Sequence, residues 1–127
     1  MEIKAIVTNN APTPAGHYSQ AIVFNGLVYV SGQVPIDPVS GERRVGTTEE
    51  QTELVLRNVG EILKAAGSDL SRVLKMTVYI TDISLWGAVN TVYSRVLGQH
   101  RPARAIVPIK ELNHGFQIEV EAIAALN

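Results

Sequence analysis

Apolar and polar residues alternate along several short stretches of this chain, the pattern of β-strands with one buried face. A short strand is expected at 4–7. Residues 21–34 predict a hairpin, because Asn25-Gly26, a dipeptide that tolerates positive φ at both turn positions, separates two β-branched and aromatic runs. Two further strands are predicted at about 104–109 and 117–125.

The stretch 72–82 alternates most regularly and predicts a half-buried strand. The side chains expected on its buried side are Leu74, Met76, Val78 and Ile80.

Two other stretches repeat their apolar residues every three or four positions and therefore predict amphipathic helices. The first, residues 47–67, begins with a threonine cap and acidic residues and closes at Gly67. Its apolar residues are Val55, Val59, Ile62, Leu63 and Ala66. The second runs through 86–97, with Asp82 or Ser84 available as its cap.

The order strands, helix, strand, helix, strands favours an α+β fold, with a single mostly antiparallel or mixed sheet and both helices packed on one face. Strand parity then assigns side chains to the two faces. Those expected toward the helices are Val28, Val30, Gly32, Ile118, Val120, Ala122 and Ala124. Those expected on the uncovered face are Tyr29, Ser31, Gln33, Glu119, Glu121 and Ile123.

One strand is entered through the sequence HRPARAIV and fits either parity. Placing Ala105, Val107 and Ile109 against the helices keeps that side uniformly apolar. Arg104 and Ile106 are then predicted on the uncovered face.

Arg104 would share that face with carboxylates, a hydroxyl and an amide, and two interpretations remain open. Arg104 could pair with Glu119 or Glu121 on a solvated surface, where ion pairs are common and weakly stabilising. Alternatively, its planar fork could bind the carboxylate of a small organic acid in a pocket, while a nearby glutamate holds or activates water.

Composition limits the possible functions. The 127 residues, 46% of them hydrophobic, suit one globular domain over 1–127. The chain has no cysteine, which excludes disulfides, thiolate nucleophiles and thiolate metal sites. A net charge of −1 provides no diffuse attraction to nucleic acid or to an anionic membrane. We see no signal or transit peptide and no run of about 18 apolar residues, so we expect a soluble cytoplasmic protein.

The remaining candidate groups give weak signals. The 3 histidines are scattered through loops without ligand spacing, so no metal site is expected. Basic residues cluster only at Arg43-Arg44 and His100-Arg101, too few to form a track for RNA. Trp86 and Tyr93, about two helical turns apart, are interpreted as packing groups.

Several motifs occur in a familiar order: APTPAGHYSQA, VYVSGQVPIDPVSGE, NVGEILKAAG, PARAIVPI and IEVEAIA. Together they span about 9–124 and closely resemble the Rid (YjgF-type) family of enamine/imine deaminases. The resemblance implies a chorismate-mutase-like fold and a homotrimer whose sheets form a central barrel, with ligand sites between subunits. It also implies cofactor-free hydrolysis of 2-enamino or 2-imino acids, such as 2-aminoacrylate and 2-iminopropanoate, to 2-oxo acids and ammonia.

The resemblance suggests catalytic roles for three residues. Arg104 would bind the substrate carboxylate, Glu119 would position or activate the attacking water, and Tyr18 would close the pocket. Glu119 could equally serve a bridge between subunits, and Tyr18 could merely pack as a loop aromatic. An imine is already electrophilic, so orientation and one well-placed water would suffice without a covalent nucleophile.

The resemblance also implies ligand contacts by Ser31, the backbone of Gly32, and Asn90 near the second helix. Ser31 could instead satisfy backbone groups at the end of its strand. Some positions depart from the family pattern. The connector VLGQHR is shorter than in the archetypal deaminases, Ile106 stands where several members have cysteine, and Asn113 stands where many have proline. These departures leave the substrate range open.

Three functions therefore remain. The first is a deaminase acting on a small 2-imino acid, with no nucleic-acid or membrane partner. The second is a non-catalytic trimer that binds or senses small carboxylates, which only a turnover measurement separates from the first. The third, ribonuclease or translation inhibitor, ranks last because it needs a basic track.

Overall fold

Within residues 1–43 and 45–127, which the computed structural model describes, the chain forms a six-stranded sheet and two α-helices. The strands are β1 (Lys4–Ile6), β2 (Ala21–Phe24), β3 (Leu27–Gln33), β4 (Val73–Ile80), β5 (Ala103–Pro108) and β6 (Ile118–Ala125). The helices are α1 (Thr48–Ala66) and α2 (Trp86–Leu97), and short 3₁₀ turns lie at Leu70–Arg72, Ile83–Leu85 and Asn113–Gly115. Arg44, half of the candidate basic pair, lies outside the described residues.

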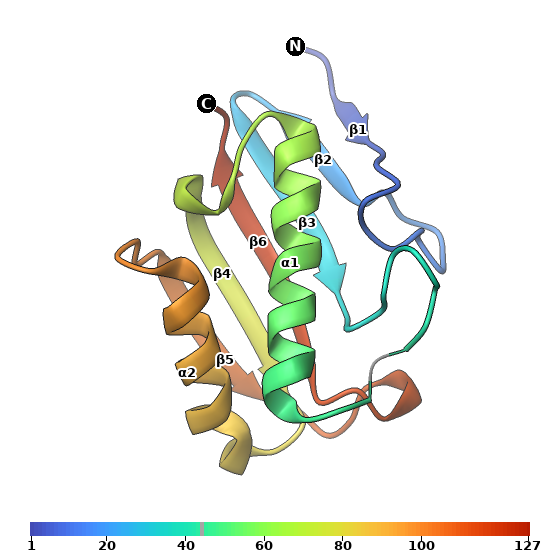
Figure 1. The fold of residues 1–127 in the computed structure, drawn as a ribbon. Coiled ribbons are helices and arrows are strands. Elements are labelled where there is room, and N and C mark those ends of the chain that lie inside the picture. Colours follow the sequence, from blue (N-terminus) through green and yellow to red (C-terminus); the bar gives the residue numbers. More distant parts are fainter. Residues whose placement is uncertain (44) are drawn as a thin grey trace.

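The strand order is β1-β2-β3-β6-β4-β5, and both helices lie on one face of this sheet (Figure 1). All neighbouring strands run antiparallel except β4 and β5, which are parallel and joined by α2. The predicted mixed sheet with both helices on one face is therefore confirmed. Among the described residues, no helix combines the length and apolar character needed to cross a lipid bilayer.

Helix α1 begins and ends where its sequence predicts. The Thr47 side chain accepts a hydrogen bond from the Glu50 backbone N–H, and the Glu50 carboxylate accepts one from the Thr47 N–H, which completes a capping box. Gly67 ends the helix in a left-handed conformation at φ 89°. Asp82, a predicted cap of the second helix, instead caps the 3₁₀ turn that precedes α2.

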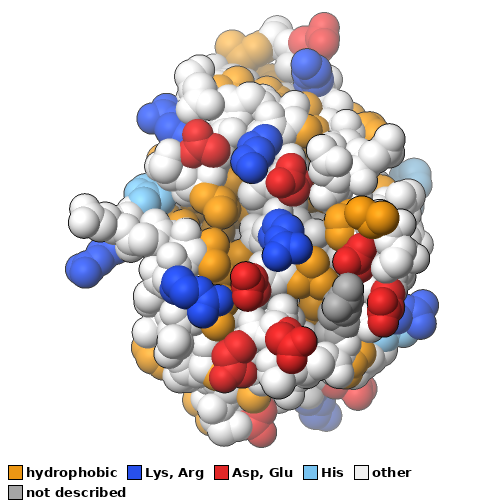
Figure 2. Space-filling model, in the orientation of Figure 1, with side chains coloured by type: hydrophobic (Ala, Val, Ile, Leu, Met, Phe, Trp, Pro, Cys, Tyr) orange, Lys and Arg blue, Asp and Glu red, His pale blue; other side chains and the backbone are white. Residues whose placement is uncertain are grey.

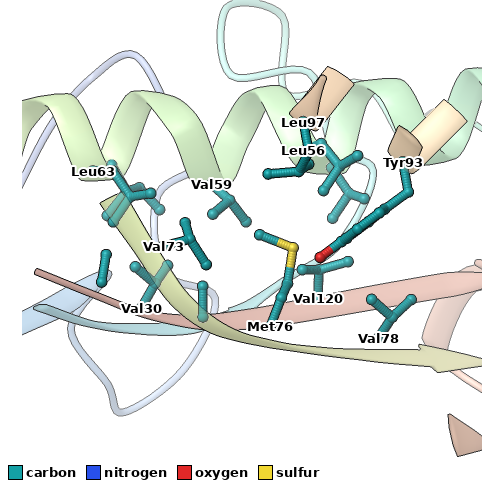
Figure 3. Close-up of a cluster of buried hydrophobic side chains, with 14 of the residues drawn as sticks. Val30, Leu56, Val59, Leu63, Val73, Met76, Val78, Tyr93, Leu97 and Val120 are labelled. Carbon is teal, nitrogen blue, oxygen red and sulfur yellow. The ribbon is translucent and has the colours of Figure 1, made fainter. Parts of the chain in front are cut away.

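A single apolar cluster fills the space between the helices and the sheet (Figure 3). Leu56, Val59 and Leu63 of α1 are fully buried and face Met76 of β4 and Val120 of β6. Tyr93 and Leu97 reach into the same cluster from α2. This packing fixes both helices to one face and leaves the other face of the sheet uncovered.

Two β-bulges alter the predicted parity. The register of β4 against β6 shifts between Val73 and Lys75, so Val73 is buried at 1% exposure and Leu74 is 49% exposed. The prediction that Leu74 faces the core is wrong for this reason, because an extra residue in one strand reverses the alternation.

The second bulge lies in β3, between Val30 and Gln33. Gln33 pairs with Val120 and is 4% exposed, so it faces the helices, whereas it was expected on the uncovered face. Gly32 was expected toward the helices, yet its Cα faces Glu119 on the uncovered side. The bulge therefore exchanges the predicted faces of these two residues.

The predicted parity of β5 is also wrong. Arg104 pairs with Met76 and Ile106 with Val78, so both side chains lie on the helix face. Val107 pairs with Tyr79 and lies on the uncovered face. The prediction assumed that every side chain facing the helices is apolar. This assumption fails at β5, because α2 supplies polar and aromatic partners for Arg104 above this edge strand.

Candidate functional site

Four of the predicted site residues line one pocket, which has a volume of about 630 Å³. The pocket lies where the loop before β2 meets the end of β3 and the segment that enters β6. The predicted residues in its wall are Tyr18, Ser31, Gly32 and Glu119. These four residues therefore lie together in one pocket, despite the bulge in β3.

Glu119 is the half-buried carboxylate of this pocket. Burial raises its pKa above the ordinary value of 4.5, and the nearby charge of Glu121 raises it further. Within the part of the chain that the structure describes, the Glu119 carboxylate forms no hydrogen bond and no ion pair. A half-buried carboxylate without a partner is available to bind water or a polar ligand.

Its neighbour Glu121 is already engaged. The Tyr79 hydroxyl donates a hydrogen bond of 2.7 Å to Glu121 Oε1, and this bond raises the pKa of Tyr79 above 10.0. Glu121 also lines a different hollow on the uncovered face, with Tyr29, Lys75 and Thr77. The two carboxylates on this face therefore differ, and Glu119 is the one suited to proton transfer.

Gly32 allows the Glu119 side chain to lie directly against the β3 backbone. A Cβ placed on Gly32 would overlap Glu119 Oε2 and would lie 3.0 Å from Glu119 Cδ. A side chain of any size at position 32 would therefore displace the carboxylate. This is the physical reason why the VSGQV motif needs glycine at this position.

Gln20 fastens the loop that forms one wall of the pocket. Its buried amide oxygen accepts a 2.7 Å hydrogen bond from the Thr8 N–H, and Nε2 donates to the carbonyls of Thr8 and Pro12, both at 3.0 Å. The Ser31 hydroxyl donates to the Ser19 carbonyl at 2.6 Å. Ser31 thus satisfies a backbone group, as the alternative interpretation held, while still lining the pocket.

Tyr18 lies at the rim of the pocket. Its side chain is 48% exposed, and its hydroxyl accepts a 3.2 Å hydrogen bond from the Ala15 N–H. An exposed aromatic on a loop tip can cover a ligand without disturbing the core. This placement fits the predicted closing role better than simple packing.

The two other predicted residues, Arg104 and Asn90, line a second pocket of about 490 Å³ between α2 and β5. Arg104 donates a 2.8 Å hydrogen bond from a guanidinium nitrogen to Asn90 Oδ1. Its guanidinium carbon lies 4.7 Å from the ring centroid of Tyr93 and 5.7 Å from that of Trp86. An amide and two aromatic faces therefore orient the arginine.

Sequence reasoning missed Trp86 and Tyr93 as part of this site, because their spacing on one face of α2 was interpreted as core packing. Tyr93 is indeed buried, but Trp86 is 41% exposed beside the guanidinium. An exposed tryptophan one helix turn before Asn90 could have pointed to a site at this helix face.

The two pockets lie on opposite faces of the sheet. Arg104 shares a face with Met76, while Glu119 pairs with Tyr79 on the uncovered face. Among the residues that the structure describes, Arg104 makes no ion pair with Glu119 or Glu121, so that alternative is wrong within one chain. The same residues include no group of three or more His, Cys, Asp or Glu side chains placed to hold a metal ion.

Comparison with known proteins gives close matches over nearly the whole chain. Residues 8–126 match the family model described as Endoribonuclease L-PSP. A 2-iminobutanoate/2-iminopropanoate deaminase from Rattus norvegicus is 45% identical over 121 residues, which cover 95% of this chain and 88% of that protein.

Two solved structures share both the fold and a substantial part of the sequence. RidA from an Antarctic Psychrobacter superposes with a TM-score of 0.92 at 38% identity and covers 97% of this chain and 99% of its own. E. coli TdcF with bound serine superposes with a TM-score of 0.92 at 35% identity and covers 98% of this chain and 99% of its own.

Proposed function

Because this chain belongs to the Rid (YjgF) family, we propose that it hydrolyses reactive 2-enamino and 2-imino acids to 2-oxo acids and ammonia. The observation that carries this proposal is the half-buried carboxylate of Glu119, which has no hydrogen-bond or ion-pair partner among the described residues, has a raised pKa, and lies in a pocket rimmed by Tyr18. The 45% identical deaminase from Rattus norvegicus supports the same reaction. 2-Aminoacrylate and 2-iminopropanoate are substrates of the expected size.

The proposed reaction adds water to the C=N bond of the imine. Glu119 accepts a proton from the water as its oxygen bonds to C2 and the C=N bond becomes a C–N single bond. The proton is then returned to the nitrogen, which gives a carbinolamine. Glu119 next transfers the proton of the C2 hydroxyl to the nitrogen as the C–N bond breaks, so that ammonia leaves and the C2 hydroxyl becomes the 2-oxo group. The raised pKa of Glu119 brings it closer to the working pH, where a carboxylate both accepts and returns a proton effectively.

Arg104 is the proposed anchor of the substrate carboxylate. A guanidinium binds a carboxylate with two parallel hydrogen bonds, which fixes the direction of the imine as well as its place. Asn90 and the rings of Tyr93 and Trp86 hold this guanidinium before substrate arrives. Such preorganisation lowers the ordering cost of binding.

A second copy of the chain is needed to unite these groups, and we therefore propose a homotrimer with sites between subunits. In one chain, Arg104 and Glu119 lie on opposite faces of the sheet, so a three-carbon acid cannot touch both. The uncovered face also exposes apolar side chains, Tyr29 at 43% and Val107 at 36%. Arg104 lies on the edge strand β5, and the assembly that we propose buries the uncovered face and places Glu119 of one copy beside this edge of the next.

The test is hydrolysis of 2-iminopropanoate generated in situ by an amino-acid oxidase, followed by release of the 2-oxo acid. We expect the protein to accelerate release. Arg104→Ala should lower kcat/KM by about 10- to 100-fold, the change that corresponds to the free energy of a hydrogen bond to a charged group. Glu119→Gln should lower kcat by about 100-fold or more. Arg95→Ala, which removes an exposed arginine paired with Glu53 at 3.3 Å, is the matched control and should leave the rate unchanged. No acceleration by a folded assembly would contradict the deaminase.

A non-catalytic binding trimer is the second candidate, and the E. coli relative with bound serine favours it, because that ligand is a small amino acid. Binding of 2-oxo acids without any turnover would select this candidate. An RNA-cleaving function, which the name of the matching family model suggests, has less support. Figure 2 shows basic and acidic side chains interspersed over the helix-covered side, without a continuous basic track there.

A further inference from the structure

The pocket between α2 and β5 has a basic lining. Its charged wall residues are Arg104, Arg101 and His100, and no acidic side chain lines it among the residues that the structure describes. The first pocket, in contrast, contains both Glu111 and Glu119. The two pockets thus differ in charge, and the one at α2 suits an anionic ligand.

Arg101 is the unexplained member of this lining. It is exposed, and within residues 1–43 and 45–127 its guanidinium forms no hydrogen bond and no ion pair. Two other exposed arginines are engaged: Arg95 pairs with Glu53 at 3.3 Å, and Arg72 donates to the Leu126 carbonyl at 2.9 Å. Arg101 therefore retains all its donors for a ligand.

The end of α2 does not cancel this charge. Helix C-termini carry partial negative charge, which would oppose an anion. Here the Gly98 N–H donates to the Ser94 carbonyl at 3.0 Å and the His100 N–H to the Leu97 carbonyl at 3.3 Å, so these carbonyls are satisfied. The His100 ring nitrogen Nε2 lies 2.7 Å from the Val73 carbonyl oxygen, and the two arginines carry the permanent positive charges of the pocket.

We propose that this pocket binds a ligand with two carboxylates, the first on Arg104 and the second on Arg101. The inferred substrates are therefore dicarboxylic 2-imino acids, and the inferred products are the matching 2-oxo acids. The reaction in this inference rests on the proposed function, whereas the recognition of two carboxylates rests on this pocket. The two positions are three residues apart, so their Cα atoms lie within about 10 Å. Flexible arginine side chains can converge from that separation onto the two ends of a five-carbon diacid.

The test compares two 2-oxo acids that differ only at the distal end. 2-Oxoglutarate ends in a carboxylate and 2-oxopentanoate in a methyl group, and calorimetry measures the dissociation constant of each. We expect the assembled protein to bind 2-oxoglutarate about three- to tenfold more tightly, the gain of a partly exposed arginine–carboxylate contact. Arg101→Gln should bring this ratio close to one while changing 2-oxopentanoate binding by less than about twofold. Arg95→Gln, which replaces an exposed arginine of α2, should leave the ratio unchanged.

Three outcomes would overturn the inference: binding of neither acid, equal binding of both, or a preference that Arg101→Gln leaves intact. Rates on the corresponding imines, generated by oxidases from glutamate and norvaline, then separate this inference from the proposed function. Acceleration of both imines with no Arg101-dependent preference would sustain the deaminase and reject the dicarboxylate. A preference in binding without acceleration of either imine would sustain the ligand class and reject the deaminase.

Discussion

Gly32 illustrates how one residue can be required by its neighbour. Replacing it with alanine would place a methyl group where Glu119 Oε2 lies. We expect Gly32→Ala to displace the carboxylate and to lower 2-imino acid hydrolysis about as far as Glu119→Gln does. The free energy of unfolding should change little, because the displaced atom is the far end of a flexible, half-exposed side chain. Kinetics and chemical denaturation measure the two effects.

Gly87→Ala is the matched control for Gly32→Ala. Gly87 lies in α2, and a Cβ there would meet nothing within 4 Å. Alanine should therefore raise helix stability by up to about 1 kcal/mol and leave the activity unchanged. Full activity of Gly32→Ala would show that the Glu119 carboxylate does not act from this position.

Glu119 also predicts a pH dependence. Its folded-state pKa is raised by burial and by Glu121, so it protonates at a higher pH than a free glutamate does. If its carboxylate is the base, kcat/KM should fall as the pH drops through that raised pKa, with an inflection above 4.5. Glu119→Gln should flatten this part of the profile. An unchanged inflection in the variant would assign it to another group.

The raised pKa of Glu119 also affects the stability of the fold, and there the charged carboxylate is unfavourable. A raised folded-state pKa means that the charged form is less stable in the folded protein, so Glu119 destabilises the fold above that pKa and ceases to do so as the pH falls through it. Glu119→Gln should therefore raise the free energy of unfolding at neutral pH, and only slightly, because solvent screens this half-exposed charge. The gain should disappear below the ordinary pKa of glutamate. A loss of stability at neutral pH would mean that the carboxylate has a stabilising partner.

At the scale of elements, the loop before β2 depends on Gln20. Gln20→Met keeps a side chain of similar length but leaves the Thr8 N–H and the Thr8 and Pro12 carbonyls without this partner. We expect a loss of about 2–3 kcal/mol of unfolding free energy and a rise in KM, because the wall that carries Tyr18 loosens. Gln99→Met, at an exposed position beyond α2, should change neither quantity. Unchanged KM in Gln20→Met would separate the loop from substrate binding.

The elements themselves could be predicted wherever local rules decide them. The ends of α1 are marked in the sequence by Thr47, Glu50 and Gly67. The hairpin is marked by Asn25-Gly26, whose φ angles are 52° and 79°. The bulges after Val30 and Val73 have no such local signal, because they depend on how β6 aligns with both neighbours. Each bulge reversed the faces of the residues beside it.

The members of the candidate site could be predicted in part, but their arrangement could not. The motifs that resemble the Rid family identified Tyr18, Ser31, Gly32 and Glu119, and these four do line one pocket. The face of Arg104 could not be predicted, because strand periodicity fits both parities at an edge strand. Partners on α2 settle the choice: Asn90 accepts its hydrogen bond and Tyr93 lies against its guanidinium.

At the scale of the whole molecule, the uncovered sheet face predicts self-association. Val107→Glu would place a charge on that face, beside Tyr79 in the parallel register. We expect the wild type to sediment as three copies of the 13.8 kDa chain and the variant to sediment as one copy, folded but inactive, because burying an unpaired charge opposes assembly. Val39→Glu, at a turn residue that is 94% exposed, should sediment as the wild type does. A monomeric wild type would remove the basis for an intersubunit site.

Mixed assemblies test whether one site draws on two copies of the chain. Arg104→Ala and Glu119→Gln alone should each keep no more than about a tenth of the wild-type activity, since each removes one half of every site. If a site takes Arg104 from one copy and Glu119 from its neighbour, random co-assembly of the two variants leaves about a quarter of the sites with both native residues, because each contributor is native half of the time. Co-expressed variants should therefore recover about a quarter of the wild-type rate per site. If both residues acted within one chain, no copy would carry both, and co-expression would restore nothing.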